Sequence, residues 1–193
     1  MFLRLGMVVA LLLLSCTEFE RDNAYDWRAD NSIYSGKLSY GGQTYKTIKI
    51  GNQNWMAENL NYNVGECSCN RQNYEDTCDK YGMLYTWETA MTACPPGWHL
   101  PSNEEWQILV DFVGGFAAAG KKLKAKNWDG ANEYGFSALP GGYGNYAGHS
   151  GAFDGKGYWW SSDGCNWVMR SGYNDISNTC YNADRYSVRC VED

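Results

Sequence analysis

The sequence predicts an α+β domain in which two helices flank a small irregular antiparallel sheet, with long glycine- and aromatic-rich loops and disulfide staples. Three observations support this class. Two helical patterns adjoin a sharp turn at residues 94–102, residues 44–57 alternate as a β-hairpin does, and the chain of 193 residues contains eight cysteines. After residue 133 the chain is rich in Gly, Tyr, Trp, Asn and Ser, which is typical of short strands between long loops.

The first helix is predicted from the spacing of its apolar residues. Four of them fall at positions i, i+3, i+4 and i+7, on one face of a helix that begins near Tyr85. They are Trp87, Ala90, Met91 and Cys94. Pro95 and Pro96 end the helix, because proline lacks the backbone N–H and clashes with the preceding turn. The stripe therefore delivers Cys94 into the core.

A second helix is predicted directly after the turn. Ser102, followed three residues later by Glu105, is a capping box in which each side chain satisfies a backbone N–H at the start of the helix. Gly114 and Gly115 end it. Its inward face consists of Trp106, Leu109, Val110 and Val113.

A hairpin precedes both helices. The turn at Gly41 and Gly42 leads into residues 44–50, and Gly51 and Asn52 turn the chain back into residues 53–57. Alternation places Ile48 and Ile50 on one face, and Tyr45, Thr47 and Lys49 on the other.

Two further elements are predicted towards the C-terminus. Residues 117–125 form a short helix with Lys121, Lys122 and Lys124 on a solvated face. Residues 186–191 form the last strand, with Tyr186, Val188 and Cys190 facing inward.

The N-terminal residues predict export and lipid anchoring. Residues 1–15 have one basic residue and then an apolar run too short to span a bilayer, which is typical of a signal peptide. This run leads into Leu-Leu-Ser-Cys16, a bacterial lipobox pattern in which the Cys16 thiol accepts the lipid. Residues 16–36 are then the lipidated N-terminus and a polar tether, and residues 37–193 are the domain.

The localisation predicted from these features is the cell envelope. Thr17 is not the aspartate that retains lipoproteins at the inner membrane in the enteric sorting pattern, which favours the outer membrane. An acidic cluster of Glu18, Glu20 and Asp22 resembles the surface-export tethers of some lipoproteins. Removing 15 of the 193 residues leaves 178, and the formal charge changes from −6 to −7 because Arg4 is lost. That charge disfavours nucleic acid as a partner.

The cysteines are expected to form disulfides in an oxidising compartment. We expect Cys94 to pair with Cys190, Cys165 with Cys180, and Cys78 with either Cys67 or Cys69, which leaves one free thiol. The Cys94–Cys190 loop stabilises by roughly 4 to 5 kcal/mol and the Cys165–Cys180 loop by about 3. Zinc is disfavoured because the chain has no pair of CxxC motifs, and no cofactor is expected.

Seven segments of the chain resemble a known family. They are residues 42–51 (GQTYKTIKIG), 55–60 (WMAENL), 81–87 (YGMLYTW), 94–102 (CPPGWHLPS), 134–142 (YGFSALPGG), 158–162 (YWWSS) and 187–190 (SVRC). In this order they resemble the Fibrobacter succinogenes major paralogous domain, whose members are typically exported proteins, many of them lipoproteins. The layout more distantly resembles the C-type-lectin-like and formylglycine-generating-enzyme folds. In the lectin-like group a helix cysteine bridges to the last strand, as proposed for Cys94 and Cys190.

The function predicted from these features is calcium-independent binding or adhesion. The triplets that bind calcium and sugar in calcium-dependent lectins are absent from the sequence, as is a recognisable reactive cysteine pair of the formylglycine-generating enzymes. Aromatic residues among Gly, Ser and Asn give large rigid contacts beside adaptable hydrogen bonds. The proposed ligand contacts are Tyr143, Tyr146, Trp160, Trp167 and Tyr173, with a partner such as plant-wall polysaccharide or another envelope protein.

Two alternatives compete with binding. The first is a structural envelope protein that scaffolds other surface proteins. The second is an enzyme, which is disfavoured because the aspartates beside Gly and Asn are typical turn formers and His99 is expected to be packed or bonded to the backbone. His149, in a glycine-rich loop, has no identifiable partner in the sequence.

Overall fold

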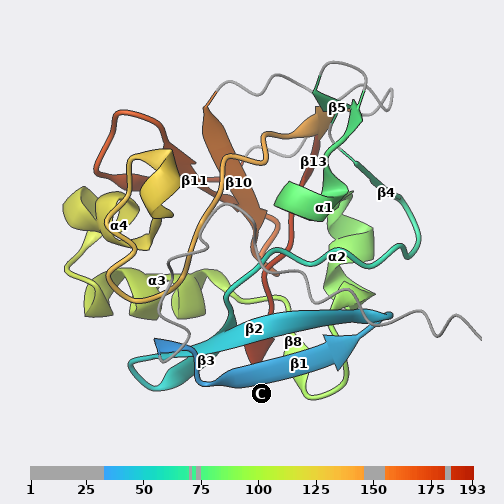
Figure 1. The fold of residues 1–193 in the computed structure, drawn as a ribbon, viewed down its shortest axis with the longest axis horizontal. Coiled ribbons are helices and arrows are strands. Elements are labelled where there is room, and N and C mark those ends of the chain that lie inside the picture. Colours follow the sequence, from blue (N-terminus) through green and yellow to red (C-terminus); the bar gives the residue numbers. More distant parts are fainter. Residues whose placement is uncertain (1–32, 70, 73–74, 146–154, 181–183) are drawn as a thin grey trace, which may run out of the picture.

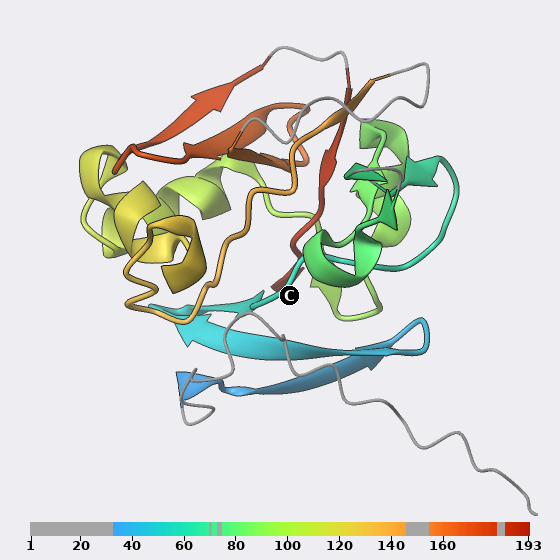
Figure 2. The ribbon, with the colours of Figure 1, turned by 45° about the horizontal axis from the view of Figure 1, so that its top comes forward.

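Two sheets enclose the helices of the domain between them (Figures 1 and 2). The computed structural model describes residues 33–69, 71–72, 75–145, 155–180 and 184–193, and the structural statements below concern these ranges. The predicted lipidation site Cys16 lies outside them, as do Tyr146 and His149. In Figure 2 the first sheet lies below, and strands of the second lie above.

The first sheet has five strands in the order β1-β2-β3-β14-β8. Their bounds are β1 Gly36–Tyr40, β2 Gln43–Ile50, β3 Gln53–Met56, β8 Trp98–His99 and β14 Val191–Glu192. The predicted hairpin is β2–β3, and a second hairpin joins β1 to β2 through Gly41 and Gly42. Ile48 and Ile50 are buried as expected, but Tyr45 and Thr47 on the opposite face are buried too, so only Lys49 of that face is exposed.

The second sheet follows the order β12-β11-β10-β13-β7-β4, with β9 paired to β13. Its strands are β4 Cys67–Ser68, β7 Leu84–Tyr85, β9 Gly144–Asn145, β10 Lys156–Trp160, β11 Asn166–Arg170, β12 Ile176–Thr179 and β13 Asp184–Ser187. A separate hairpin pairs β5 Arg71–Gln72 with β6 Glu75–Asp76. The prediction of one antiparallel sheet needs correction, because there are two large sheets and β10 pairs with β13 in parallel.

Four α-helices are present in the described residues: α1 Cys78–Tyr81, α2 Trp87–Ala93, α3 Asn103–Phe112 and α4 Phe116–Leu123. A short 3-10 helix, η2, spans Lys126–Trp128. None of these helices is long and apolar enough to cross a membrane.

Both predicted helices flanking the turn are present. The capping box at the start of α3 is complete, and all four residues of its predicted inward face are buried. The predicted stripe of α2 is wrong at Met91, which is 45% exposed. Ala90 is buried as predicted, and Ala93, which was not part of the predicted stripe, is buried as well.

The predicted exposure of Lys124 is also wrong. Its ammonium group is buried and donates to the Asp129 carboxylate and to the backbone carbonyls of Arg170 (2.9 Å) and Tyr173 (2.8 Å). These acceptors compensate the cost of removing the charge from water. Lys124 therefore ties the end of α4 to the turn between β11 and β12.

The predicted last strand is divided between the two sheets. Tyr186 and Ser187 end β13, and Val191 begins β14, so the chain crosses from one sheet to the other at residues 188–190. The carbonyls of Val188 and Cys190 accept from the N–H groups of Leu60 (2.8 Å) and Met56 (3.0 Å) during this crossing. Residues of both faces are consequently buried, including Arg189.

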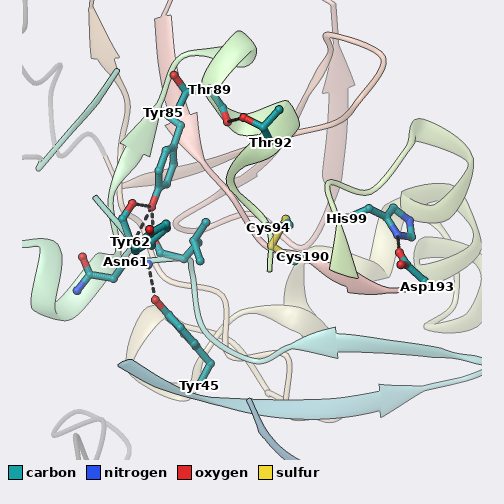
Figure 3. The surroundings of a disulfide bond; sticks show 11 residues. Tyr45, Asn61, Tyr62, Tyr85, Thr89, Thr92, Cys94, His99, Cys190 and Asp193 are labelled. Carbon is teal, nitrogen blue, oxygen red and sulfur yellow. Dashed lines mark hydrogen bonds and ion pairs between the residues drawn. A yellow bond between two sulfur atoms is a disulfide. The ribbon is translucent and has the colours of Figure 1, made fainter. Parts of the chain in front are cut away.

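Three disulfides join Cys69 to Cys78, Cys94 to Cys190, and Cys165 to Cys180. Cys69 is therefore the partner of Cys78, whereas the sequence did not distinguish Cys69 from Cys67. Cys67 is the free thiol among the described residues. The Cys94–Cys190 bond connects the end of α2 to the segment between the two sheets (Figure 3).

Candidate binding surface

A buried hydrogen-bond network joins segments that are distant in the sequence. The Asn59 side-chain oxygen accepts from Arg189 Nε (3.1 Å), Arg189 Nη2 (2.8 Å) and Trp159 Nε1 (2.8 Å). Arg189 also donates to the Phe136 carbonyl, and its guanidinium lies 4.2 Å from the centre of the Phe136 ring. Asn59 in turn donates to the Tyr81 carbonyl (2.8 Å) and the Ser187 hydroxyl.

Arg189 is charged although it is only 1% exposed. Burial lowers the pKa of Arg189 to about 9, and the charge of Glu58 opposes that shift. The guanidinium therefore keeps its proton at pH 7. The neutral oxygens of Asn59 and Phe136, together with the ring face, solvate the cation in place of water.

Five of the seven segments that resemble a known family each contribute one residue to this network. Asn59 comes from WMAENL, Tyr81 from YGMLYTW, Phe136 from YGFSALPGG, Trp159 from YWWSS and Arg189 from SVRC. These five segments thus meet in the interior of the domain. The sequence contained a signal for this network that the prediction did not use. Asn59 and Arg189 are polar residues within two of these segments, beside apolar residues.

Two tyrosines hold the loop that follows Asn59. The Tyr85 hydroxyl accepts from the Tyr62 N–H (3.0 Å) and donates to the Tyr62 carbonyl (2.8 Å), and the Tyr45 hydroxyl accepts from the Asn61 N–H (3.1 Å) (Figure 3). Burial raises the pKa of Tyr85 from its ordinary value, so its proton remains available as a donor. The two rings fix the backbone of residues 61–62 from opposite sheets.

His99 lies between two carboxylates at the surface, which corrects the expectation of a packed or backbone-bonded residue. Its Nδ1 is 2.7 Å from Asp193 and its Nε2 is 2.8 Å from Glu105 (Figure 3 shows the Asp193 contact). Burial by itself lowers the pKa of His99, but the two carboxylates outweigh it and raise the pKa. The Glu105 pKa is lowered: burial opposes this, and the Ser102 N–H and His99 outweigh it.

The carboxylates occupy opposite ring nitrogens of His99, so the three groups do not converge on one point. In the ranges that the structure describes, no group of three or more His, Cys, Asp and Glu side chains could hold a metal ion. The arrangement is an ion-pair tie between β8, the first turn of α3 and Asp193.

A row of aromatic rings in mutual contact leads from buried Trp160 to half-buried Tyr143. Buried Trp160 packs against Tyr186 with centroids 4.5 Å apart, and Tyr186 stacks on Tyr158 at 5.3 Å with 18° between the planes. Tyr143 meets Tyr158 edge to face at 5.6 Å. We call these four residues the aromatic ladder; Trp160 and Tyr186 are buried, whereas Tyr158 and Tyr143 are half-buried.

The two proposed ligand residues within the ladder, Tyr143 and Trp160, differ in their exposure to solvent. Tyr143 lies at the solvent end of the ladder, where its ring is partly exposed. The prediction that Trp160 contacts a ligand is wrong, because Trp160 is 2% exposed and its indole N–H donates to the Tyr85 carbonyl (2.7 Å). Tyr158 lies two residues before Trp160 on β10, on the same face of the strand, and is the half-buried neighbour of Tyr143 in the ladder.

The prediction that Trp167 contacts a ligand is also wrong. It is 2% exposed because Trp106 (5.7 Å) and Phe116 (5.8 Å) stack on its two sides, and its N–H donates to the Asn103 side chain. Tyr173 is 55% exposed, but it lies in the turn between β11 and β12, with Arg170 over its ring at 4.5 Å. The structure therefore brings only Tyr143 and Trp160 of the described proposed contacts into one cluster.

Comparison with known proteins places the chain in a family. A profile of the Fibrobacter succinogenes major domain matches residues 48–192. No curated protein and no solved structure matches the chain. The matched range contains the Asn59–Arg189 network, the aromatic ladder and all three disulfides. The chain belongs to the Fibrobacter succinogenes major domain family.

Proposed function

We propose that this protein is an exported, lipid-anchored envelope protein whose domain binds a partner outside the cell without calcium. The observation that carries the binding proposal is the aromatic ladder. Its buried members fix the rings of Tyr158 and Tyr143, so little side-chain freedom is lost when a ligand stacks on them. Partly exposed rings held in this way offer flat apolar contact to a sugar or a peptide.

We also propose that the fold is a variant of the C-type-lectin-like architecture. The Cys94–Cys190 bond between a helix end and the C-terminal segment supports this proposal. The position of β14 between β3 and β8 supports it as well, because it brings the C-terminal strand into the same sheet as the N-terminal hairpin.

The anchoring proposal predicts a change of phase on loss of the Cys16 thiol. Replacing Cys16 with serine removes the lipid acceptor, so the variant should move from the detergent phase to the aqueous phase on phase partitioning. A variant that stays in the detergent phase as fully as the wild-type protein would show that another element holds it to the membrane.

The binding proposal predicts that the solvent end of the ladder contributes most of the contact energy. Tyr143→Ala and Tyr158→Ala should each weaken binding by roughly 1 kcal/mol or more. The measurement is titration of residues 16–193, carrying Cys16→Ser, against a panel of plant-wall polysaccharides, with and without a chelator. Binding should be the same in both conditions.

Tyr173→Ala is the matched control, because Tyr173 is an exposed tyrosine outside the ladder. Its binding should equal that of the wild type, while the circular dichroism spectra of all three variants should match. Binding that a chelator abolishes, or that only Tyr173→Ala weakens, contradicts the proposal. Capture of an envelope protein, sensitive to Tyr158→Ala, with no polysaccharide bound, would favour the scaffolding function.

A further inference from the structure

The contact of His99 with two carboxylates joins three segments of the chain. His99 lies on β8, Glu105 lies in the first turn of α3, and Asp193 follows β14 (Figure 3 shows His99 and Asp193). The ring places Nε2 2.8 Å from Glu105 and Nδ1 2.7 Å from Asp193. A protonated imidazole has an N–H group on each nitrogen and can donate to both carboxylates, whereas a neutral imidazole has only one N–H group. Both contacts therefore cannot remain hydrogen bonds once His99 loses its proton.

The Glu105 carboxylate also has donors other than His99. Its second oxygen, Oε2, accepts from the Ser102 N–H (2.8 Å) and the Ser102 hydroxyl (3.0 Å), as part of the capping box. The Gln53 side-chain amide donates to the Glu105 carbonyl (3.0 Å), so β3 holds the same turn. The Glu105 side chain is 26% exposed, and water can replace a lost donor there less readily than at an open carboxylate.

The contact of Asp193 is the more exposed of the two. The Asp193 side chain is 63% exposed, so water can solvate its carboxylate when the ring no longer donates to it. The Asp193 N–H donates to the Gly97 carbonyl (3.0 Å). The amide of residue 193 therefore reports whether this residue stays on the domain.

Among the described residues, these two carboxylates are the charged groups that contact His99. The strands β3 and β8 contain no other ionisable side chain. Glu192 on β14 accepts from the Asn54 amide (2.8 Å), and Glu104 on α3 is exposed to solvent.

The two carboxylates make His99 easier to protonate. Burial alone would lower the pKa of His99, but Asp193 and Glu105 outweigh burial and raise the pKa above its ordinary value. The folded protein thus holds this proton more tightly than the unfolded chain. While the carboxylates stay charged, the contribution of the contact to folding is complete below about pH 6.5, and it is lost as pH rises through the raised pKa of His99.

We propose that His99 is a pH-dependent latch, whose protonated ring holds Asp193 on the domain and whose neutral ring releases Asp193 but keeps its contact with Glu105. The remaining proton lies on Nε2, because Glu105 is the less exposed carboxylate and losing a donor costs more there. The Nδ1 lone pair then faces the Asp193 carboxylate, and two acceptors repel each other at this distance. The end of β14 is closed on β8 and α3 in mildly acidic solution, and it loosens above the His99 transition. The latch needs neither the lipid nor the aromatic ladder.

The test combines nitrogen NMR of the imidazole ring with hydrogen exchange of backbone amides, in residues 16–193 carrying Cys16→Ser. The chain contains two histidines, and the ring signals that His99→Gln removes are those of His99. On titration from about pH 5 to about pH 9, the neutral ring should carry its proton on Nε2. The Asp193 amide, corrected for the intrinsic pH dependence of exchange, should exchange roughly two to five times faster above the ring transition, as expected for loss of an exposed ion pair.

Two variants that each remove one negative charge separate the latch from a general effect of pH. Asp193→Asn offers an amide donor to Nδ1 of the neutral ring, so the amide of residue 193 should no longer exchange faster above the transition. Glu192→Gln is the matched control, because it removes an equal charge one residue earlier, from a side chain that contacts Asn54 and not His99. It should keep the acceleration seen in the wild-type protein.

The Met56 amide, which donates to a backbone carbonyl just before β14 (3.0 Å), should keep its protection at every pH and so exclude general unfolding. Three results would each overturn the proposal. They are a neutral ring with its proton on Nδ1, an Asp193 amide whose corrected exchange does not change across the transition, and an acceleration that Asp193→Asn leaves intact.

Discussion

Asn59→Leu should destabilise the domain by about 3 to 5 kcal/mol. The substitution removes the oxygen that accepts from Arg189 twice and from Trp159 once, and leaves a buried cation with too few acceptors. Urea unfolding, with the disulfides intact, measures the loss as a lower midpoint at an unchanged slope. The large value follows from desolvation, since Arg189 cannot reach water where it lies.

A double-mutant cycle tests whether the buried charge is the cause. Arg189→Met removes the cation, so the double variant Asn59→Leu, Arg189→Met should lose less stability than the two single losses added together, by more than about 1 kcal/mol. Asn54→Leu is the matched control, because the Asn54 amide donates to Glu192 at the exposed surface. It should cost less than about 1 kcal/mol. Additive single losses would mean that Asn59 acts through packing alone.

The elements predicted correctly depend on neighbours in the sequence. The capping box of α3 needs only Ser102 and Glu105, three residues apart, and the β2–β3 hairpin needs only its alternation and the turn at Gly51. Such signals are complete within a few residues. The inward face of α3 is likewise a spacing pattern, and it packs in the core as expected.

The elements predicted wrongly depend on residues that are distant in sequence. Lys124 follows Lys121 and Lys122 in a pattern typical of a solvated face, but its ammonium group donates to the Asp129 carboxylate and to the carbonyls of Arg170 and Tyr173, which lie more than forty positions later in the chain. Trp167 sits in a glycine-rich region typical of binding loops, yet it stacks between Trp106 and Phe116. Composition predicted which residue types gather, but it could not say which rings cover which.

The candidate site, too, was predictable from the sequence only in part. The sequence indicated aromatic residues after position 140, and Tyr143 is partly exposed there. It could not show that β13 pairs with β10 in parallel, and that pairing is what brings Tyr186 between Tyr158 and Trp160. The ladder therefore depends on the sheet topology. Its members come from segments that meet only in the folded domain, so the sequence alone does not identify its exposed end.

Loss of the Cys94–Cys190 disulfide should be the other large effect. Cys94→Ala with Cys190→Ala opens a loop with a sequence separation of 96 residues, which in the chain-entropy model costs roughly 4 to 5 kcal/mol. Cys165→Ala with Cys180→Ala opens a separation of 15 residues and should cost about 3 kcal/mol. Urea unfolding of both double variants measures the two losses.

Both double variants should be made on a Cys67→Ser background, because the free Cys67 thiol could otherwise exchange with the remaining disulfides during unfolding. Cys190 adjoins Arg189, so the bond also fixes the segment that carries the buried cation. The expected order is therefore a larger loss for the Cys94–Cys190 pair than for the Cys165–Cys180 pair. Equal losses, or the reverse order, would show that the closed loop does not determine the contribution of the long-range bond.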